Sequence, residues 1–477
     1  MSLASSDLPD RRGEDYVGRA PLELPRGDQR VSRGRWHLPV RHSIIWRPSR
    51  LLRNSLDLMA SSAASAGLGL VFWAVAARVA PAADVGRNSA EVAAMTLLAS
   101  LAQLGLPNVV NRFLPVAADR SGRFLYRCYV TSAVVAVLIA IVYVVAGLGD
   151  GFLPHFWAGR ALFVVSVPVW VIFVIQDAAL VGVHRSKWIP VENTLFSAAK
   201  LAILVPLVGY SARSGLFVAW ALPMLAAVAV VNWYLAQRAL PEHMASSTRQ
   251  SGLPSLRGIV SFVAGDYVAN VLGVVSALVL PLIVLERLGA TATAHFYLPW
   301  TVAAAFGQLT WNLTTSFVAE AAFEGQLTRR LARRAIRIGL ALIIPVVVIG
   351  VALAPFVLDI FGREYSREST TLLRLLLLGL LGTAVNAFYS AIAWIDRTVW
   401  RLAIRQMLTG ATLIGVTVAT ITHLGITAVG VGVVATEGAE VALMLPACVR
   451  RYRRMPSGLG SGPTLVGPTA SGAVMPE

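Results

Sequence analysis

The sequence predicts an all-α polytopic membrane protein whose twelve transmembrane helices form two parallel six-helix repeats around a central cavity. Three observations support this fold class. First, 56% of the 477 residues are hydrophobic and only 14% are charged, whereas soluble domains carry about 25% charged residues. Second, apolar runs recur that are long enough to cross a bilayer core of about 30 Å. Third, a pattern of arginines recurs after 209–212 residues.

Apolar runs that are interrupted by Gly, Pro and charged residues predict the twelve spans. Their expected limits are 55–79, 88–113, 124–148, 160–183, 190–210, 214–237, 258–285, 293–320, 335–361, 369–395, 400–422 and 425–449. These spans divide the chain into five parts. The parts are a disordered basic tail (1–54) whose last stretch, SIIWRPSRLLRN, can form an interfacial helix, an N-terminal six-helix bundle (55–238), a cytoplasmic linker (239–257), a C-terminal six-helix bundle (258–450) and a second disordered tail (451–477).

The basic residues predict the orientation of the spans. Of 41 Lys and Arg residues, 32 flank the spans on the side of the N-terminus and 7 lie in the opposite loops, if Arg405 is counted as a flanking residue. Because cytoplasmic loops are enriched in basic residues, both termini are expected in the cytoplasm and the protein in the cytoplasmic membrane. The sequence pI is about 10.7. The placement of the arginines in loops and tails argues against nucleic acid as a partner.

An internal repeat relates the two bundles. Arg78 follows Asp57 by 21 residues, and Arg287 follows Asp266 by the same distance. RFLYR and RAIR open the third and ninth spans, and RSKW and RTVW follow the fourth and tenth. Because six spans return the chain to the same side, the repeats are parallel and are expected to enclose a cavity, as in rocking alternating-access transporters.

The first two spans also carry the motif of a known family. An Ala77-Arg78 pair is followed by a loop with Pro81 and Gly86, then by LGLP at 104–107 and by Arg112 in an Arg-x-x-Pro pattern. This run resembles the polysaccharide flippases of the multidrug/oligosaccharidyl-lipid/polysaccharide exporter (MOP) superfamily. The resemblance covers residues 55 to 450. It implies a transporter rather than an enzyme, which moves a polyprenyl-diphosphate-linked oligosaccharide across the membrane for surface polysaccharide synthesis.

The resemblance further implies membrane lipid and polysaccharide-assembly enzymes as partners. A cation-coupled multidrug antiporter of the same superfamily is the alternative. A membrane glycosyltransferase or polymerase is disfavoured because the outer loops are short. No nucleotide-binding or zinc pattern occurs in the sequence. We therefore expect no cofactor and no metal, and an ion gradient or the membrane potential as the energy source.

Basic residues inside or next to the spans are candidate substrate-binding groups, because a diphosphate requires positive charge. Lys200 lies about ten residues into the fifth span. The functional interpretation is that it attracts an anionic substrate. The structural alternatives are that it snorkels or forms a salt bridge. Arg374 enters the tenth span by only a few residues, which favours snorkelling over substrate binding. Arg78 and Arg112 of the family motif are the other two candidates.

Six acidic residues are candidate ion-coupling or cavity carboxylates, and internal ion pairs are the general structural alternative. They are Asp57, Glu91, Asp177, Asp266, Glu437 and Glu440. Asp57 is also explained as a first-turn carboxylate that complements the helix dipole, whereas Asp266 lies too deep in its span for that explanation. Glu437 and Glu440 share a face of the twelfth span, which suits either a shared proton or a polar contact between helices. Glu91, near a helix end, can simply be solvated.

Overall fold

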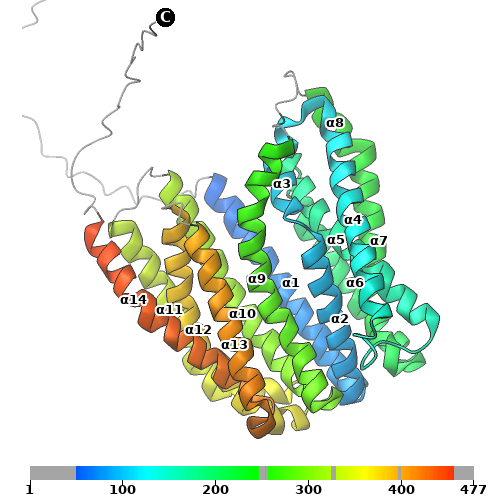
Figure 1. The fold of residues 1–477 in the computed structure, drawn as a ribbon, viewed down its shortest axis with the longest axis vertical. Coiled ribbons are helices and arrows are strands. Elements are labelled where there is room, and N and C mark those ends of the chain that lie inside the picture. Colours follow the sequence, from blue (N-terminus) through cyan, green and yellow to red (C-terminus); the bar gives the residue numbers. More distant parts are fainter. Residues whose placement is uncertain (1–49, 247–252, 254–255, 324–328, 396–398, 456–477) are drawn as a thin grey trace, which may run out of the picture. The chain divides into compact units, whose positions relative to one another are not determined.

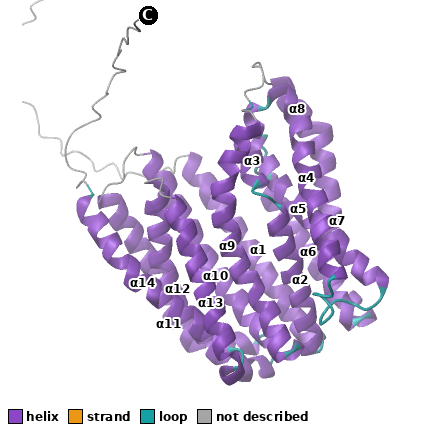
Figure 2. Ribbon diagram, viewed as in Figure 1, coloured by secondary structure: helices purple, strands orange, loops and turns teal. Residues whose placement is uncertain are grey.

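The computed structural model describes residues 50–246, 253, 256–323, 329–395 and 399–455. The predicted disordered tails, apart from residues 50–54 and 451–455, lie outside the described residues. Within the described part the chain is helical and contains no β-strand (Figure 2), so the predicted all-α class is confirmed.

Helices of the first half, residues 50–246, are followed by an equivalent series in the second half, residues 256–454. The first half contains α1 (Arg50–Val79), α2 (Ala82–Ala102), α3 (Leu106–Phe113), α4 (Ser121–Val145), α5 (Trp157–Gly182), α6 (Trp188–Tyr210), α7 (Ala212–Tyr234) and the short α8 (Leu240–Ser246). The second half contains α9 (Leu256–Leu288), α10 (Ala290–Phe323), α11 (Arg329–Asp359), α12 (Arg363–Ile395), α13 (Val399–Leu424) and α14 (Thr427–Arg454).

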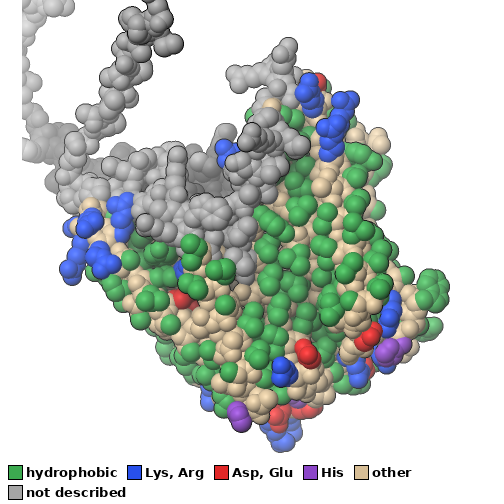
Figure 3. Space-filling model, in the orientation of Figure 1, with side chains coloured by type: hydrophobic (Ala, Val, Ile, Leu, Met, Phe, Trp, Pro, Cys, Tyr) green, Lys and Arg blue, Asp and Glu red, His purple; other side chains and the backbone are tan. Residues whose placement is uncertain are grey.

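Each of the twelve predicted spans corresponds to one helix or, in one case, to a bent pair. Eight helices of the described residues are long and apolar enough to cross a membrane, and the bent pair would be a ninth such span. Hydrophobic side chains are spread over the middle of the face seen in Figure 3, and most of the visible Lys and Arg side chains lie toward its ends. This distribution is what lipid around the middle of the bundle requires.

The second predicted span, 88–113, is not continuous. α2 ends before Leu104 and Gly105, whose φ angles are 51° and 69°, and α3 continues at an angle of 54°. Two successive left-handed residues end an α-helix, and Pro107 suits the first turn of the helix that follows. The LGLP motif is therefore a helix break.

Packing follows the predicted repeat. α1 packs against α6 as α9 packs against α13, and α4 packs against α5 as α11 packs against α12. The pairs α6–α7 and α5–α7 likewise have α13–α14 and α12–α14 as equivalents. The two halves meet through α1, α2, α9 and α10, with α4–α8 on one side of this group and α11–α14 on the other (Figure 1).

The two halves approach each other closely where α2 and α10 begin. A Cβ atom on Gly86 would lie 1.8 Å from the Ala290 carbonyl oxygen, so only glycine permits this approach. A cavity of about 480 Å³ lies between α1 of the first half and α10, α11 and α12 of the second. Every lining residue is apolar or glycine, including Leu70, Phe306 and Leu353.

Candidate functional site: buried polar networks in both halves

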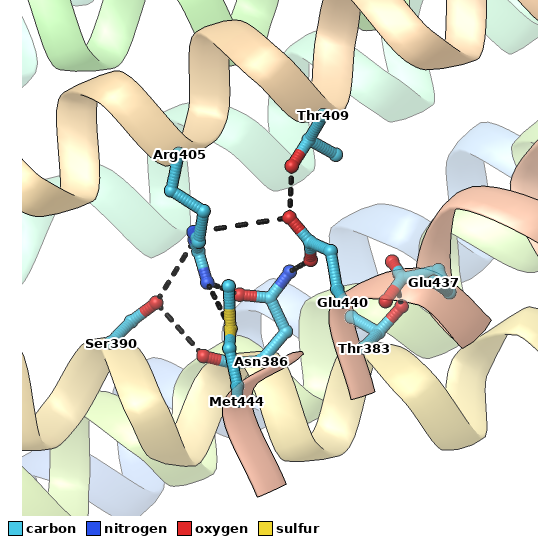
Figure 4. A network of polar contacts seen from close by, with 8 residues as sticks. All are labelled: Thr383, Asn386, Ser390, Arg405, Thr409, Glu437, Glu440 and Met444. Carbon is cyan, nitrogen blue, oxygen red and sulfur yellow. Dashed lines mark hydrogen bonds and ion pairs between the residues drawn. The ribbon is translucent and has the colours of Figure 1, made fainter. Parts of the chain in front are cut away.

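A polar network joins α12, α13 and α14 in the second half, and we call it the C-half network (Figure 4). Each helix contributes polar groups three, four or seven residues apart, so each set lies on one helix face. The members are Thr383, Asn386 and Ser390 of α12, Arg405 and Thr409 of α13, and Glu437, Glu440 and Met444 of α14.

Asn386 is the central member of this network. Its Nδ2 donates to Glu440 Oε2, and its Oδ1 accepts from Arg405 Nη1. Arg405 Nη2 also donates to Ser390 Oγ at 3.3 Å, and its Nε lies 4.0 Å from Glu440 Oε1. Thr409 donates to that same carboxylate oxygen. The Arg405 and Glu440 side chains are only 12% and 8% exposed, so the two charges form a buried ion pair. Arg405 Nε itself has no hydrogen-bond partner among the described residues.

Glu437, predicted as a partner of Glu440, has separate contacts. Its Oε1 accepts from Thr383 Oγ1 at 2.9 Å, and its Oε2 is buried without a hydrogen-bond partner among the described residues. Gly382 makes room for it, because a Cβ there would lie 2.6 Å from the Glu437 Cβ. The two glutamates belong to one network but share no hydrogen bond within the described part of the chain.

A second network joins α5, α6 and α7, and we call it the N-half network. Its central member, Gln176, is fully buried. Gln176 Nε2 donates to Glu192 Oε1, and its Oε1 accepts from Asn232 Nδ2 at 2.6 Å. Glu192 Oε2 is buried and has no partner among the described residues. Asp177, the neighbour of Gln176, is half-buried, and its Oδ1 is likewise without a partner there.

The two networks occupy equivalent places in the repeat. Asn386 follows Gln176 by 210 residues, Arg405 follows Glu192 by 213, and Glu440 follows Asn232 by 208. In both, the central amide donates to a glutamate and accepts from a second donor. The acid lies on α6 in the first half but on α14, the equivalent of α7, in the second. The charges of the two networks therefore differ although their hydrogen-bond order is the same.

Lys200 lies on the same buried stripe of α6 as Glu192. Glu192, Phe196 and Lys200 are four residues apart and all buried, so about 12 Å of helix separates the acid from the ammonium. Lys200 Nζ lies 5.3 Å from the Phe72 ring centre, 4.9 Å from that of Phe196 and 5.4 Å from that of Trp220. No acceptor or carboxylate among the described residues pairs with it. The predicted salt bridge is thus not seen there.

The other predicted cations have different surroundings. Arg78 donates to the backbone carbonyls of Asp359 at 2.6 Å and Ile360 at 3.0 Å, which satisfies the last carbonyls of α11. Arg374 Nε donates to the Val351 carbonyl at 3.1 Å. Pro355 lacks the N–H that this carbonyl would receive in a regular helix, so Arg374 replaces it.

Arg112 is exposed on α3, with its guanidinium 5.6 Å from the Phe113 ring centre. It does not belong to either polar network. Like those of Arg78 and Arg374, its role in substrate binding remains a prediction.

The three remaining predicted carboxylates are not among the members of the two networks described above. Glu91 is buried on α2, with 2% of its surface exposed, so the expectation that it is solvated is wrong. Asp57 and Asp266 belong to α1 and α9, but their side chains lie outside the described residues. Because α1 begins at Arg50 and has no acidic residue in its first turn, the first-turn explanation of Asp57 is wrong. Leu and Arg favour helix, and the helix extends through RLLRN.

Sequence reasoning predicted only Glu437 and Glu440 among the members of the two networks. Gln176, Glu192, Asn232 and Asn386 were not singled out, and Arg405 was counted with the basic residues that flank the spans. α13 begins at Val399, so Arg405 lies in its second turn and turns inward to Glu440. The repeat offset of 209–212 residues would have found one pair, because it aligns Asn386 with Gln176, whereas the spacings of 213 and 208 for the other two pairs lie just outside it.

Comparisons with known proteins support the fold and leave the family unassigned. No family model and no curated protein matches the sequence. Among solved structures, the lipid II flippase MurJ in an inward closed conformation superposes with a TM-score of 0.58 at 11% identity, covering 85% of this chain and 89% of that one. An inward-facing multidrug resistance MATE family transporter of the MOP superfamily gives a TM-score of 0.56 at 16% identity, covering 82% and 94%.

A mutant of the Vibrio cholerae MATE transporter VcmN gives a TM-score of 0.54 at 11% identity, covering 84% of this chain and 97% of that one. These matches span nearly the whole of each related protein. The chain therefore has the fold of the MOP-superfamily transporters.

Proposed function

We propose that this protein is a flippase that moves a polyprenyl-diphosphate-linked oligosaccharide across the cytoplasmic membrane by alternating access, for the synthesis of surface polysaccharide. The observation that carries the proposal is the buried ammonium of Lys200. The apolar cavity between the halves and the fold shared with a MOP-superfamily transporter and with a lipid II flippase support it.

Lys200 is suited to an anionic ligand. The ring faces of Phe72, Phe196 and Trp220 attract its charge, each by about 0.5–2 kcal/mol, but they accept no conventional hydrogen bond. Burying a charged donor without an acceptor is costly. A diphosphate supplies acceptor oxygens and the opposite charge, so it would compensate this ammonium when the ligand is bound.

The cavity between the halves is suited to the other part of such a ligand. It is lined only by apolar residues and glycine and borders α1 as well as α10, α11 and α12, which belong to different halves. An isoprenoid chain placed there would remain in apolar surroundings while the halves rock. Glu192, Asp177 and Glu437 each have one buried carboxylate oxygen without a partner among the described residues, and these groups would link this motion to an ion gradient.

The test is export of the cognate polysaccharide by cells that carry Lys200→Ala. We expect export to fall and lipid-linked precursor to accumulate on the cytoplasmic leaflet. Lys187→Ala is the matched control, because Lys187 is the only other lysine and is exposed. Lys200→Arg should retain part of the export, since it keeps the charge. Normal export by a well-expressed Lys200→Ala protein would refute the proposal for Lys200.

The alternative, a cation-coupled multidrug antiporter, has an observation of its own. Glu91, Asp177 and Glu192 are carboxylates of the first half that form no ion pair with a described basic side chain. Such groups can bind cationic drugs or coupling ions. Efflux of ethidium from proteoliposomes, driven by an imposed sodium or proton gradient, would favour this alternative. Movement of a fluorescent polyprenyl-diphosphate oligosaccharide between leaflets would favour the flippase.

A further inference from the structure

The beginning of α11 and the end of α14 form one cluster of arginines, which we call the arginine cluster. It lies at the membrane-surface ends of the two helices, because apolar residues follow it in α11 and precede it in α14. Its members are Arg329, Arg330, Arg333, Arg334 and Arg337 of α11 and Arg450, Arg451, Arg453 and Arg454 of α14.

Tyr452 holds the two helix ends together. Arg333 Nε donates to its hydroxyl at 3.2 Å, and the Arg329 guanidinium lies 5.9 Å from its ring centre. Arg329 Nη2 also donates to the Arg453 carbonyl at 2.6 Å. These contacts bring like charges together, which costs free energy that the hydrogen bonds only partly offset.

Three arginines of the cluster have no acidic partner in the described part of the chain. None of the ion pairs found there includes Arg330, Arg453 or Arg454. Arg329 Nε is buried and has no hydrogen-bond partner among the described residues. The first turn of α11 contains no acidic residue, so its arginines add to the positive end of the helix dipole instead of opposing it.

The equivalent helix end in the first half, after α7, has an acidic residue. There the residues that follow α7 include Glu242, which pairs with Arg238 and with Arg185. The acid neutralises that helix end from within the chain. No acid among the described residues pairs with Arg453 or Arg454 at the end of α14, so these two guanidinium groups are open to an anion from outside the chain.

We propose that the arginine cluster binds the headgroup of an anionic phospholipid and prefers a lipid with two phosphates. Guanidinium groups bind phosphate oxygens in pairs, and basic pockets between transmembrane helices bind such headgroups. The cluster draws its arginines from two helix ends, so guanidinium groups of both helices can bind a headgroup with two phosphates. The proposal concerns a lipid that stays at the membrane surface and does not depend on the transported substrate.

The test uses the full-length protein in phosphatidylcholine nanodiscs to which tetraoleoyl cardiolipin is added, with bound lipid counted by native mass spectrometry. Removing three arginines in R329Q/R333Q/R453Q should weaken binding on the order of 100-fold, because each basic residue at an anionic surface contributes about fivefold. The control is R123Q/R127Q, which removes two exposed arginines at the equivalent end of α4 and should leave binding unchanged. The charge-retaining variant R329K/R333K/R453K should keep most of the binding.

Three results would overturn the proposal. The first is an equal loss in the α4 control, which would indicate only general surface charge. The second is a loss in the lysine variant as large as in the glutamine variant. The third is binding of polyprenyl diphosphate but not of cardiolipin by the wild-type protein, which would assign the cluster to the substrate instead.

Discussion

Arg405 is the residue of the C-half network whose replacement has the largest predicted effect on stability. Its guanidinium bonds Asn386 and Ser390 and pairs with Glu440. Arg405→Gln would leave the Glu440 carboxylate, 8% exposed, with two neutral donors and no compensating cation. Removing one partner of a buried ion pair costs about 3–5 kcal/mol, whereas hydrogen bonds between membrane helices average about 0.6 kcal/mol each.

The two mechanisms therefore predict different outcomes for a double variant. If the unpaired charge dominates, R405Q/E440Q removes both charges and should lie within about 1 kcal/mol of the wild type, because a neutral polar pair replaces the ion pair. If the hydrogen bonds dominate, the effects of the two single variants should add. We expect the first outcome, with a coupling free energy of about 2 kcal/mol or more.

The assay is unfolding of the full-length protein in mixed micelles, followed by the fluorescence of its twelve tryptophans. Arg367→Gln is the control, since Arg367 is exposed on α12 and should change the free energy of unfolding by less than about 0.5 kcal/mol. Additive losses in the double variant, or a loss in Arg405→Gln no larger than in the control, would refute the role of charge burial.

Two further predictions use the same unfolding assay. Arg374→Ala should lower the free energy of unfolding by about 1 kcal/mol, because it leaves the Val351 carbonyl unpaired. This loss should vanish in a Pro355→Ala background, where the new backbone N–H can reach that carbonyl. An unchanged loss would contradict the proposed role of Pro355. Gly382→Ala should lower the free energy of unfolding by about 1–3 kcal/mol, because its Cβ would overlap the Glu437 Cβ. Gly438→Ala has no atom within 4 Å of its Cβ and should stabilise α14 by about 0.5–1 kcal/mol. Equal effects at the two glycines would show that this contact can relax.

The sequence was sufficient to locate the helices because a span must be both long and apolar, and that requirement is visible without any tertiary information. It was insufficient at Leu104. Gly105 and Pro107 are ordinary signals of a helix boundary, but a leucine with φ of 51° carries no such signal. Only packing around the break can hold it in that conformation, so 88–113 was predicted as one helix.

The candidate site was predictable where a residue contrasted with its neighbours. Lys200 stood out as an ammonium in an apolar run, and Glu437 and Glu440 stood out by their spacing. Gln176, Asn232 and Asn386 did not, because a neutral amide in a span has many ordinary explanations. Arg405 was missed for another reason: helix boundaries are uncertain by a few residues, and a basic residue near a boundary is usually assigned to the loop.

The repeat shows what duplication preserved in these networks. An amide on α5 or α12 lies between a glutamate and a donor in both halves, so the order of hydrogen bonds is the same. The donor is an amide, Asn232, in the first half and a guanidinium, Arg405, in the second. A guanidinium in place of an amide changes the net charge of the three bonded residues, but the order of their hydrogen bonds stays the same. Glu440 consequently has both oxygens bonded and a cation at 4.0 Å, while Glu192 has one oxygen without a partner among the described residues. The two halves therefore present different groups in these networks: a carboxylate oxygen without a partner among the described residues in the first, and a carboxylate with both oxygens bonded in the second.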